Sequence, residues 1–273
     1  MNEQFTLPDG TVVGTGLMLP PPQFKSDLPV YEDSGPMWTW EQIDSVVKAG
    51  LADGRKKFDK SLIKNQRNHG SCNGFAGSSA QTRARMRRGL SRVDLSGAYL
   101  YSLINGNRDN GSMLDDGMNA LMKQGCAEEQ YAKWNQIYRS QYDTRAADAS
   151  AARFKADECY AVGTKQGLFS ALAAGFDCVV AVHVESGFNV NRDGVVTEGR
   201  GPGNHAVGCD GAIWDEKYGY LTTNYNSWDV VYGIDGRMLC SWEYQYQYTT
   251  KYHKFYAIRT TGDDPQGNNP PVP

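Results

Sequence analysis

Three short segments, far apart in the chain, carry a thiol, an imidazole and an amide in an order that suits nucleophilic catalysis. The first contains Cys72, the second His205 and the third Asn226. A thiol near its free pKa of about 8.5 is only slightly ionised, and a nearby imidazole and a helix N-terminus both favour the reactive thiolate. An amide bonded to the second ring nitrogen would hold the imidazole in place. These residues predict acyl transfer through Cys72, with His205 moving the proton.

Helical segments are expected mainly in the first half of the chain. Residues 76–88 contain no proline, are rich in Ala, Ser, Gln, Arg and Met, and are followed by Gly89, so Cys72 would lie at the N-terminus of a helix. Residues 139–153 fit either a helix or a surface connection. The other expected helices are 40–49, capped by Thr39 and ended by Gly50, then 95–103, 114–123 and 167–175.

The second half of the chain has the patterns of strands. We expect strands at residues 179–184, 206–213, 218–223 and 252–259. The alternating Tyr and Gln side chains of residues 244–248 fit a half-exposed strand better than a platform for sugars or nucleic acid. His183, between two valines, is expected to lie in a strand.

Composition limits the kinds of partner. A formal net charge of -3, from 28 basic and 31 acidic residues, gives no global attraction to nucleic acid or to an anionic membrane. No window has the roughly 20 apolar residues of a membrane span, and the first residues do not resemble a signal peptide. The one basic cluster is expected to be a solvated helix face; it contains Arg83, Arg85, Arg87 and Arg88.

The cysteines do not form the pattern of a disulfide scaffold or of a zinc site. There are six of them, and reserving Cys72 as a nucleophile leaves an odd number, so complete pairing fails. We therefore expect no metal and no cofactor. A reducing location is favoured, in the cytoplasm or in a particle such as a virion.

Several motifs resemble those of papain-like cysteine peptidases and follow that family's chain order. Residues 204–208, around His205, resemble its histidine motif, and residues 226–228 resemble its Asn-Ser-Trp motif. Residues 232–236 are similar to the aromatic-Gly-x-x-Gly that follows. The 133 positions from Cys72 to His205 lie within the family's usual interval. The resemblance covers roughly residues 58–259 and indicates a divergent member.

The resemblance implies a fold and a division of the chain. The fold would be α+β and two-lobed, with a mainly helical N-terminal lobe, a β-barrel-like C-terminal lobe and the active site in the cleft between them. Residues 1–57 would form an arm and a short helix, and residues 58–152 the lobe with the nucleophile. Residues 153–260 would form the lobe with the histidine and asparagine, and residues 261–273 a flexible tail with the composition of disorder.

The resemblance also implies roles for particular residues. Cys72 would be the nucleophile, His205 its base and Asn226 the residue that orients the ring. Gln66, six positions before Cys72, would donate its amide to the oxyanion, and losing one such donor costs about 3 kcal/mol in acyl transfer. Trp228 would shield the imidazole–amide hydrogen bond from water. The remaining residues expected to line the substrate cleft are Gly70, Ser71, Gly111, Ser112 and Asn204.

Three positions and one segment depart from the family pattern. Asn73 stands where an aromatic residue usually follows the nucleophile, and His69 stands where a cysteine usually lies three residues before it, so the matching disulfide is absent. The cysteine-led Gly-Gly segment that forms one wall of the cleft has only residues 110–114 as its counterpart. Asp229 replaces a usual glycine after Trp228. His69 is close enough to Cys72 to reach the cleft, although a loop position is the simpler interpretation.

These departures leave three functions open. The first is a thiol endopeptidase that forms an acyl-enzyme with a peptide or protein substrate. The second is a papain-like binding or structural protein with little turnover, belonging to a larger assembly such as a virion, since papain-like domains resemble some phage-encoded proteins. The third is transfer of the acyl group to an amine instead of water.

The N-terminal arm is a candidate regulator of the cleft. The 71 residues before Cys72 are too few for both a full inhibitory propeptide and the opening strand of the body. We therefore expect the Pro-rich residues 19–24 to lie over or near the cleft.

Overall fold

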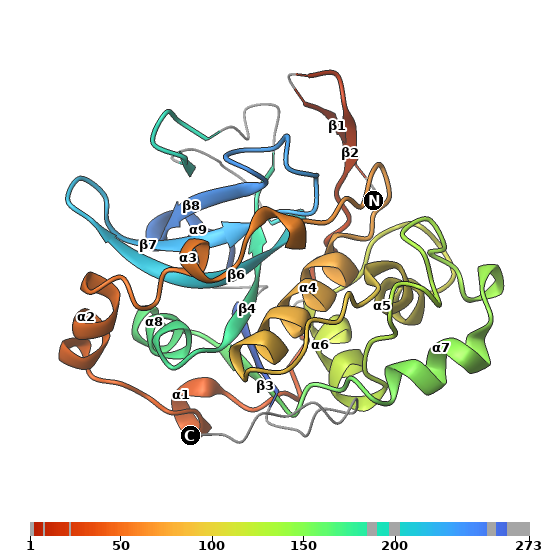
Figure 1. The fold of residues 1–273 in the computed structure, drawn as a ribbon, viewed down its shortest axis with the longest axis horizontal. Helices are drawn as coiled ribbons and strands as arrows, with labels where there is room; N and C mark the ends of the chain where they lie inside the picture. The colour runs from red at the N-terminus through yellow and green to blue at the C-terminus, as the bar shows by residue number, and fades with distance from the viewer. Residues whose placement is uncertain are drawn as a thin grey trace.

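A computed structural model describes residues 3–7, 9–21, 23–184, 190–196, 203–249 and 255–260. The helices are packed on both sides of one large sheet, with α4 near the centre of the molecule (Figure 1). The α-helices are α1 (Tyr31–Ser34), α2 (Trp40–Lys48), α3 (Gly54–Lys57), α4 (Cys72–Arg87), α5 (Gly97–Ile104), α6 (Leu114–Lys123), α7 (Thr144–Ala151), α8 (Lys165–Ala173) and α9 (Trp242–Thr249). Two short 3-10 helices are η1 (Lys60–Leu62) and η2 (Arg139–Gln141).

The strands form a two-stranded hairpin and a seven-stranded sheet. The hairpin is β1 (Gln4–Thr6) with β2 (Val12–Gly14). The large sheet has the order β3-β9-β4-β6-β7-β8-β5, and its neighbours are antiparallel except for the parallel pair β5 and β8. Its strands are β3 (Glu158–Val162), β4 (Asp177–Val182), β5 (Val195–Val196), β6 (His205–Asp215), β7 (Gly219–Tyr225), β8 (Arg237–Ser241) and β9 (Phe255–Arg259).

The central strands bury side chains on both faces of the sheet. In β4, Val180 and Val182 face one apolar core with α2, α8 and α9, whereas Val179 and Ala181 face a second core with α4 and α6. Successive strand residues point to opposite faces, so a strand covered on both sides reads as a continuous apolar run. This two-sided burial joins the helical half of the chain to the sheet.

Helix α4 is buried along nearly its whole length. Every residue from Cys72 to Arg85 is buried, which explains why its sequence has no clear amphipathic stripe. Gly74 allows α5 to approach, because a β-carbon there would lie 2.4 Å from the Gly97 carbonyl oxygen. Gly89, at φ +75°, ends the helix in the left-handed conformation that glycine adopts easily. The helix therefore holds its first residue, Cys72, in a fixed place beside the sheet.

The basic cluster in α4 is not the solvated face that the sequence suggested. Arg83 and Arg85 are buried, and only Arg88 of the four arginines is exposed. Arg83 lies 3.3 Å from the Asp210 carboxylate on β6, and Arg87 lies 2.7 Å from the Asp177 carboxylate on β4. The charges face acidic residues of the sheet, more than 80 positions away in the chain, and the local sequence gives no sign of that pairing.

Two further expectations need correction. Residues 244–248 belong to helix α9 instead of a half-exposed strand, because Trp242 and Tyr246 stack one helical turn apart at 4.6 Å between ring centroids. The β-rich half is an open sheet, and the described strands close no barrel. His183 lies just after β4, not within it.

Most of the expected elements are present with shifted ends. The helix at 114–123 matches α6, Thr39 caps α2 through a capping box, and the undecided stretch 139–153 contains η2 and α7. The strand expected at 252–259 is described only from Phe255, and the tail 261–273 lies outside the described residues. No helix among the described residues combines the length and apolar character needed to cross a bilayer.

Removing the Asp210 charge should destabilise the fold. Its carboxylate is fully buried and also accepts bonds from Arg237 at 2.9 Å and Thr223 at 2.9 Å, so Asp210→Asn leaves buried guanidinium groups without their counter-ion. We expect the free energy of unfolding in urea to fall by about 3 to 5 kcal/mol. The control Asp44→Asn, which removes an exposed pair with Lys48, should cost less than about 1 kcal/mol. Equal effects of the two variants would contradict this assignment.

Candidate active site

Cys72 begins α4, beside the first residues of β6. Its thiol is fully buried, and the backbone amides of Ala206 and Gly16 hydrogen-bond to the sulfur and favour the thiolate. Gly70 and Ser71 precede it in the same buried loop. The helix N-terminus adds a partial positive charge at this position. The amides and the helix N-terminus therefore favour the thiolate, whereas burial of the sulfur opposes it.

His205, Asn226 and Trp228 form one compact group at the edge of the sheet. The imidazole Nε2 lies 2.8 Å from Asn226 Oδ1, and the Trp228 ring stacks on the imidazole at 4.4 Å between centroids. All three side chains are buried. Within the described part of the chain, the buried Nδ1 of His205 has no hydrogen-bond partner. The ring is thus held at one nitrogen, and the other nitrogen is left for proton transfer.

Gln66 and Asn226 are held by neighbouring backbone. The Asn226 amide N–H donates to the Gly236 carbonyl at 2.9 Å, and Gln66 Oε1 accepts from Ser227 Oγ at 2.5 Å. The backbone N–H of Gln66 donates to the Ser227 carbonyl at 2.8 Å. The glutamine motif and the Asn-Ser-Trp motif are therefore one connected hydrogen-bonded unit.

Asp229 occupies a position that normally favours glycine. Its φ is +68°, in the left-handed region that few residues other than glycine adopt. Its carboxylate accepts from Asn65 Nδ2 at 3.0 Å and from the Val230 amide at 2.7 Å. These local bonds stabilise the conformation, so the departure from the family pattern leaves the turn after Trp228 intact.

The N-terminal arm, here the described residues 3–7 and 9–21, contacts the segments that were expected to line the cleft. The Ser112 amide donates to the Gly16 carbonyl at 2.8 Å, and the Met18 amide donates to the Ser112 carbonyl at 3.0 Å. The Leu17 amide donates to the Asn204 carbonyl at 3.0 Å. Leu17 and Ser112 form a parallel bridge, with Gly111 next to it at φ +92°. All the cleft residues expected from the sequence are thus gathered around the arm or the thiol.

The residues of the arm that occupy the cleft are not the expected ones. Residues 14–18 make the contacts, whereas Leu19 and Phe24 of the predicted 19–24 segment are exposed. The Gly14 carbonyl accepts from Gln66 Nε2 at 3.0 Å and from Trp228 Nε1 at 3.2 Å. The Gly-rich sequence of residues 14–18 does not differ from that of an ordinary turn. The prediction therefore rested on the prolines of residues 19–24.

Burial sets the protonation state of the closed site. Burial raises the pKa of the Cys72 thiol to about 11, although the amides around the sulfur act in the opposite direction. Burial lowers the pKa of His205 to about 4, although the hydrogen bond with Asn226 partly opposes this. Both groups are therefore neutral near pH 7 while the arm is in place.

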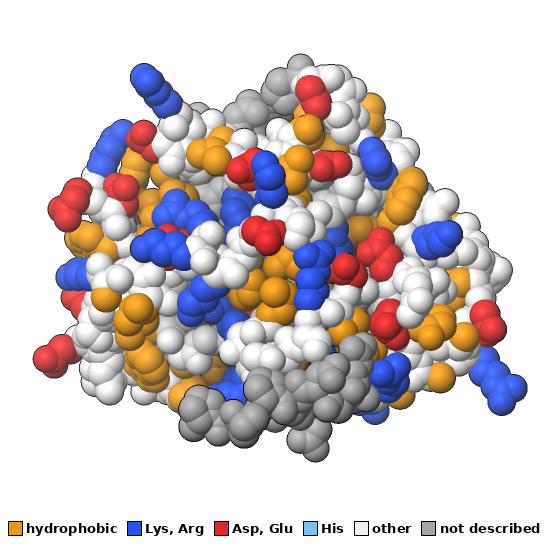
Figure 2. All heavy atoms as spheres, in the orientation of Figure 1, with side chains coloured by type: hydrophobic (Ala, Val, Ile, Leu, Met, Phe, Trp, Pro, Cys, Tyr) orange, Lys and Arg blue, Asp and Glu red, His pale blue; other side chains and the backbone are white. Residues whose placement is uncertain are grey.

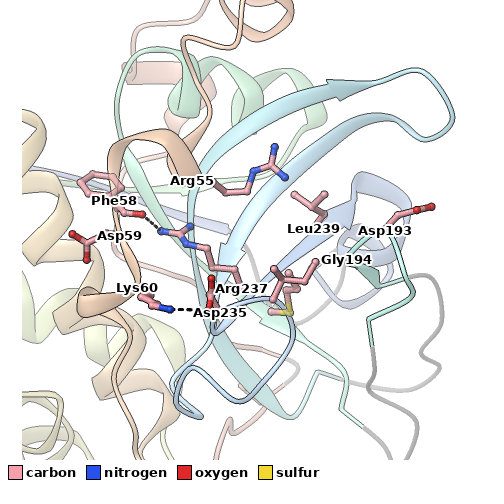
Figure 3. Close-up of a pocket in the computed structure, with 11 residues that line it drawn as sticks. Arg55, Phe58, Asp59, Lys60, Asp193, Gly194, Asp235, Arg237 and Leu239 are labelled. Atoms are coloured by element: carbon pink, nitrogen blue, oxygen red, sulfur yellow. Dashed lines mark hydrogen bonds and ion pairs between the residues drawn. The ribbon is translucent and has the colours of Figure 1, made fainter.

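One hollow lies away from this group, between α3 and the β5–β8 side of the sheet (Figure 3). It has a volume of about 390 Å³, and neither cysteine nor histidine lines it. Two of its charged side chains, Lys60 and Asp235, pair with each other at 3.4 Å, and Arg237 pairs with Asp210 at 2.9 Å. On the face shown in Figure 2, basic and acidic side chains lie among one another, without a continuous surface of one sign. No three described His, Cys, Asp or Glu side chains could hold a metal ion together.

Comparison with known proteins agrees with this geometry. The model of the papain family of cysteine proteases matches residues 51–258, so the chain belongs to that family. A search of curated protein sequences finds no match.

All six cysteines are free and buried in this structure.

Solved structures of cysteine proteases have the same fold. Xylellain from Xylella fastidiosa has a TM-score of 0.69 at 20% identity, covering 96% of this chain and 99% of that one. The proform of the ragweed pollen allergen Amb a 11 has a TM-score of 0.63 at 21% identity, covering 80% and 66%. Digestive procathepsin L 3 of Tenebrio molitor has a TM-score of 0.58 at 16% identity, covering 72% and 66%. The expected papain-like α+β fold is thereby confirmed.

Labelling of Cys72 should have an unusual pH dependence. The unfolded or opened chain has a His205 pKa near about 6.5, so it binds a proton between pH 6.5 and 4 that the closed form does not bind. The closed form therefore loses stability as pH falls, and the opening equilibrium should rise about a hundredfold from pH 7 to pH 4. Each pH unit also removes about nine-tenths of the reactive thiolate, so the rise in opening should nearly offset this loss. Iodoacetamide modification of Cys72, followed by mass spectrometry, should therefore change little between about pH 6.5 and pH 5.

The control for this prediction is His205→Ala, in which the proton-binding group is gone. Its Cys72 labelling should slow as pH falls, as for an ordinary thiol. A labelling rate that also stays nearly constant in this variant would show that another group is responsible.

Proposed function

We propose that this protein is a cysteine endopeptidase that acts through Cys72, His205 and Asn226. The observation that carries the proposal is the 2.8 Å contact of His205 Nε2 with Asn226 Oδ1, which leaves the buried Nδ1 without a hydrogen-bond partner among the described residues. A ring fixed in this way meets the requirement for a base that is itself oriented by a third group. The family assignment supports peptide bonds as the substrate.

The proposed reaction begins with transfer of the Cys72 proton to His205 Nδ1. The thiolate then attacks the peptide carbonyl carbon, and the carbonyl π electrons move to oxygen. The Cys72 amide and Gln66 Nε2 stabilise that oxyanion. When the C–N bond breaks, the imidazolium protonates the leaving amine. Water, deprotonated by the imidazole, hydrolyses the thioester and restores the thiol.

We infer that the arm keeps this site closed. It occupies the Gln66 amide donor, both backbone groups of Ser112 and the Asn204 carbonyl, which are the groups that an extended peptide would need. The Gly16 N–H of the arm also hydrogen-bonds to the Cys72 sulfur. Burial by the arm also keeps the thiol and imidazole neutral. Release of the arm would free the donors and hydrate the catalytic pair together.

The second candidate, a binding protein with little turnover, is favoured by the neutral charge state of the closed site. The binding protein differs from the peptidase in one respect. Its arm would stay in place permanently and would prevent ionisation of the thiol and imidazole near neutral pH. The role in a larger assembly stays a prediction. Displacing the arm therefore distinguishes the two candidate functions.

Displacing the arm should produce peptidase activity. A β-carbon at Gly16 would lie 2.0 Å from the Gly70 carbonyl oxygen, so Gly16→Ala cannot keep the arm in the cleft. We expect this variant, and a chain lacking the residues before Ser26, to hydrolyse a fluorogenic peptide library at least tenfold faster than the full chain, since a tenfold change corresponds to about 1.4 kcal/mol of arm binding.

Two controls accompany this measurement. Gly10→Asn changes the same arm at a position with open space, and asparagine tolerates its φ of +86°, so activity should stay low. Adding Cys72→Ala to the Gly16→Ala chain should abolish hydrolysis. Absence of turnover in a folded Gly16→Ala chain whose Cys72 has become accessible would sink the peptidase proposal and favour the binding protein.

A further inference from the structure

Asp109 connects the nucleophile loop to the wall of the cleft. Its Oδ1 accepts from the Gly70 amide at 2.8 Å, and its Oδ2 lies 3.1 Å from His69 Nδ1. Gly70 and His69 lie two and three positions before Cys72, whereas Asp109 lies three positions before Ser112 of the wall. One carboxylate therefore joins two segments about 40 residues apart in the chain.

The connection continues through Tyr101 on α5. The Tyr101 hydroxyl donates to Asp109 Oδ1 at 3.0 Å and accepts from the Gly111 amide at 2.9 Å. Gly111 is in close contact with the arm, because a β-carbon there would lie 2.0 Å from the Gly16 carbonyl oxygen. The position of this glycine thus decides how near the wall approaches any chain in the cleft.

The donors around Asp109 keep it ionised. Burial raises its pKa, but the hydrogen bonds from His69, Gly70 and Tyr101 outweigh burial and hold the pKa below its usual value. Hydrogen bonds to an ionised acceptor are roughly twice as strong as those between neutral groups. The carboxylate is therefore a strong tie between the loop and the wall near neutral pH.

A second tie comes from Asn73, directly after the nucleophile. Its Nδ2 donates to the Met113 carbonyl at 2.6 Å and to Ser112 Oγ at 3.1 Å. Asn73 and His69 are two of the positions at which this chain departs from the papain-family pattern, and both side chains contact the wall or its anchor. All six cysteines are free, so no disulfide joins the loop to the wall.

We propose that Asp109 is a positioning residue that holds the Gly111–Ser112 wall against the Cys72 loop at the spacing an extended chain needs, as a polar substitute for a covalent link. The same wall would pair with the arm in the closed form and with a substrate in the open form. The consequence for substrate rests on the proposed peptidase function, whereas the consequence for the arm does not.

The test uses the full chain and the rate at which iodoacetamide modifies each cysteine at pH 7. Asp109→Ala should loosen the wall and the arm together, and speed Cys72 modification about tenfold, as expected for the loss of charge-assisted hydrogen bonds. The five other cysteines are buried as well and should stay slow, which distinguishes a local effect from unfolding. Asp109→Asn keeps an oxygen for Gly70 and Tyr101, and should stay within about threefold of the original chain.

Asp148→Ala is the matched control. Asp148 also accepts from a tyrosine of α5, Tyr99 at 2.8 Å, and pairs with an arginine, Arg139 at 2.6 Å, but it contacts no residue of the cleft. Its loss should leave Cys72 labelling unchanged. Equal rates for Asp109→Ala and the original chain would overturn the proposal, as would an Asn variant as fast as the Ala variant.

A second readout applies to turnover. In the Gly16→Ala background, Asp109→Ala should raise KM for a fluorogenic peptide about tenfold with kcat changed less than threefold, because backbone pairing binds the substrate and its transition state alike. A fall in kcat with KM unchanged would contradict a role in the wall. If no variant turns over, the labelling rates still decide the role of Asp109, and only the peptidase proposal fails.

Discussion

The structure depends on burying one polar helix between a sheet and a helical layer. Helix α4 carries Arg83 and Arg87 into the interior or its margin, where Asp210 and Asp177 of the sheet neutralise them. A buried charge without a partner is too costly to keep, so the geometry of these pairs fixes the helix against β4 and β6. Because β6 begins with His205, the same pairs fix the thiol relative to the imidazole.

The arm changes the chemistry of the site through its electrostatics. A thiol and an imidazole become an ion pair only where water or other polar groups can stabilise the charges. Burial favours the neutral form of both groups in this structure, so under the proposed function the arm would block the substrate and suppress ionisation together. Its bonds are mostly to backbone groups, which is the recognition that a cleft for extended peptides would use with many sequences.

The sequence predicted the features that depend on local residue patterns or on motifs of the papain family. The helix beginning near Cys72, the capping of α2 by Thr39 and the papain-like fold are of this kind. The partners of Arg83 and Arg87 could not be predicted, because a pairing between helix and strand residues distant in the chain produces no periodic pattern in the sequence. The helix α9 was misread because alternating Tyr and Gln satisfies a strand pattern, while stacking of Trp242 on Tyr246 occurs only once the chain is packed.

Within the site, the sequence singled out Cys72, His205, Asn226 and Gln66, and their catalytic roles stay a proposal. It missed Asp109 and Tyr101, since a carboxylate in a polar loop and a tyrosine in a helix have many structural explanations. The occupation of the cleft by residues 14–18 was also missed, because backbone recognition depends little on side chains. Glycine permits such a close backbone contact because it has no side chain. Glycine is also common in turns, so its presence does not indicate this contact.

The central claim is that His205, oriented by Asn226, activates Cys72 once the arm leaves. The most direct measurement is intact-mass labelling of the Gly16→Ala chain with an epoxysuccinyl probe under reducing conditions at about pH 6, with and without His205→Ala. The account predicts a single fast adduct on Cys72, whose rate falls at least a hundredfold without the imidazole, since general acid–base groups typically contribute about 10² to 10⁴ in rate. Labelling at the rate of an ordinary thiol, unaffected by removal of His205, would contradict it.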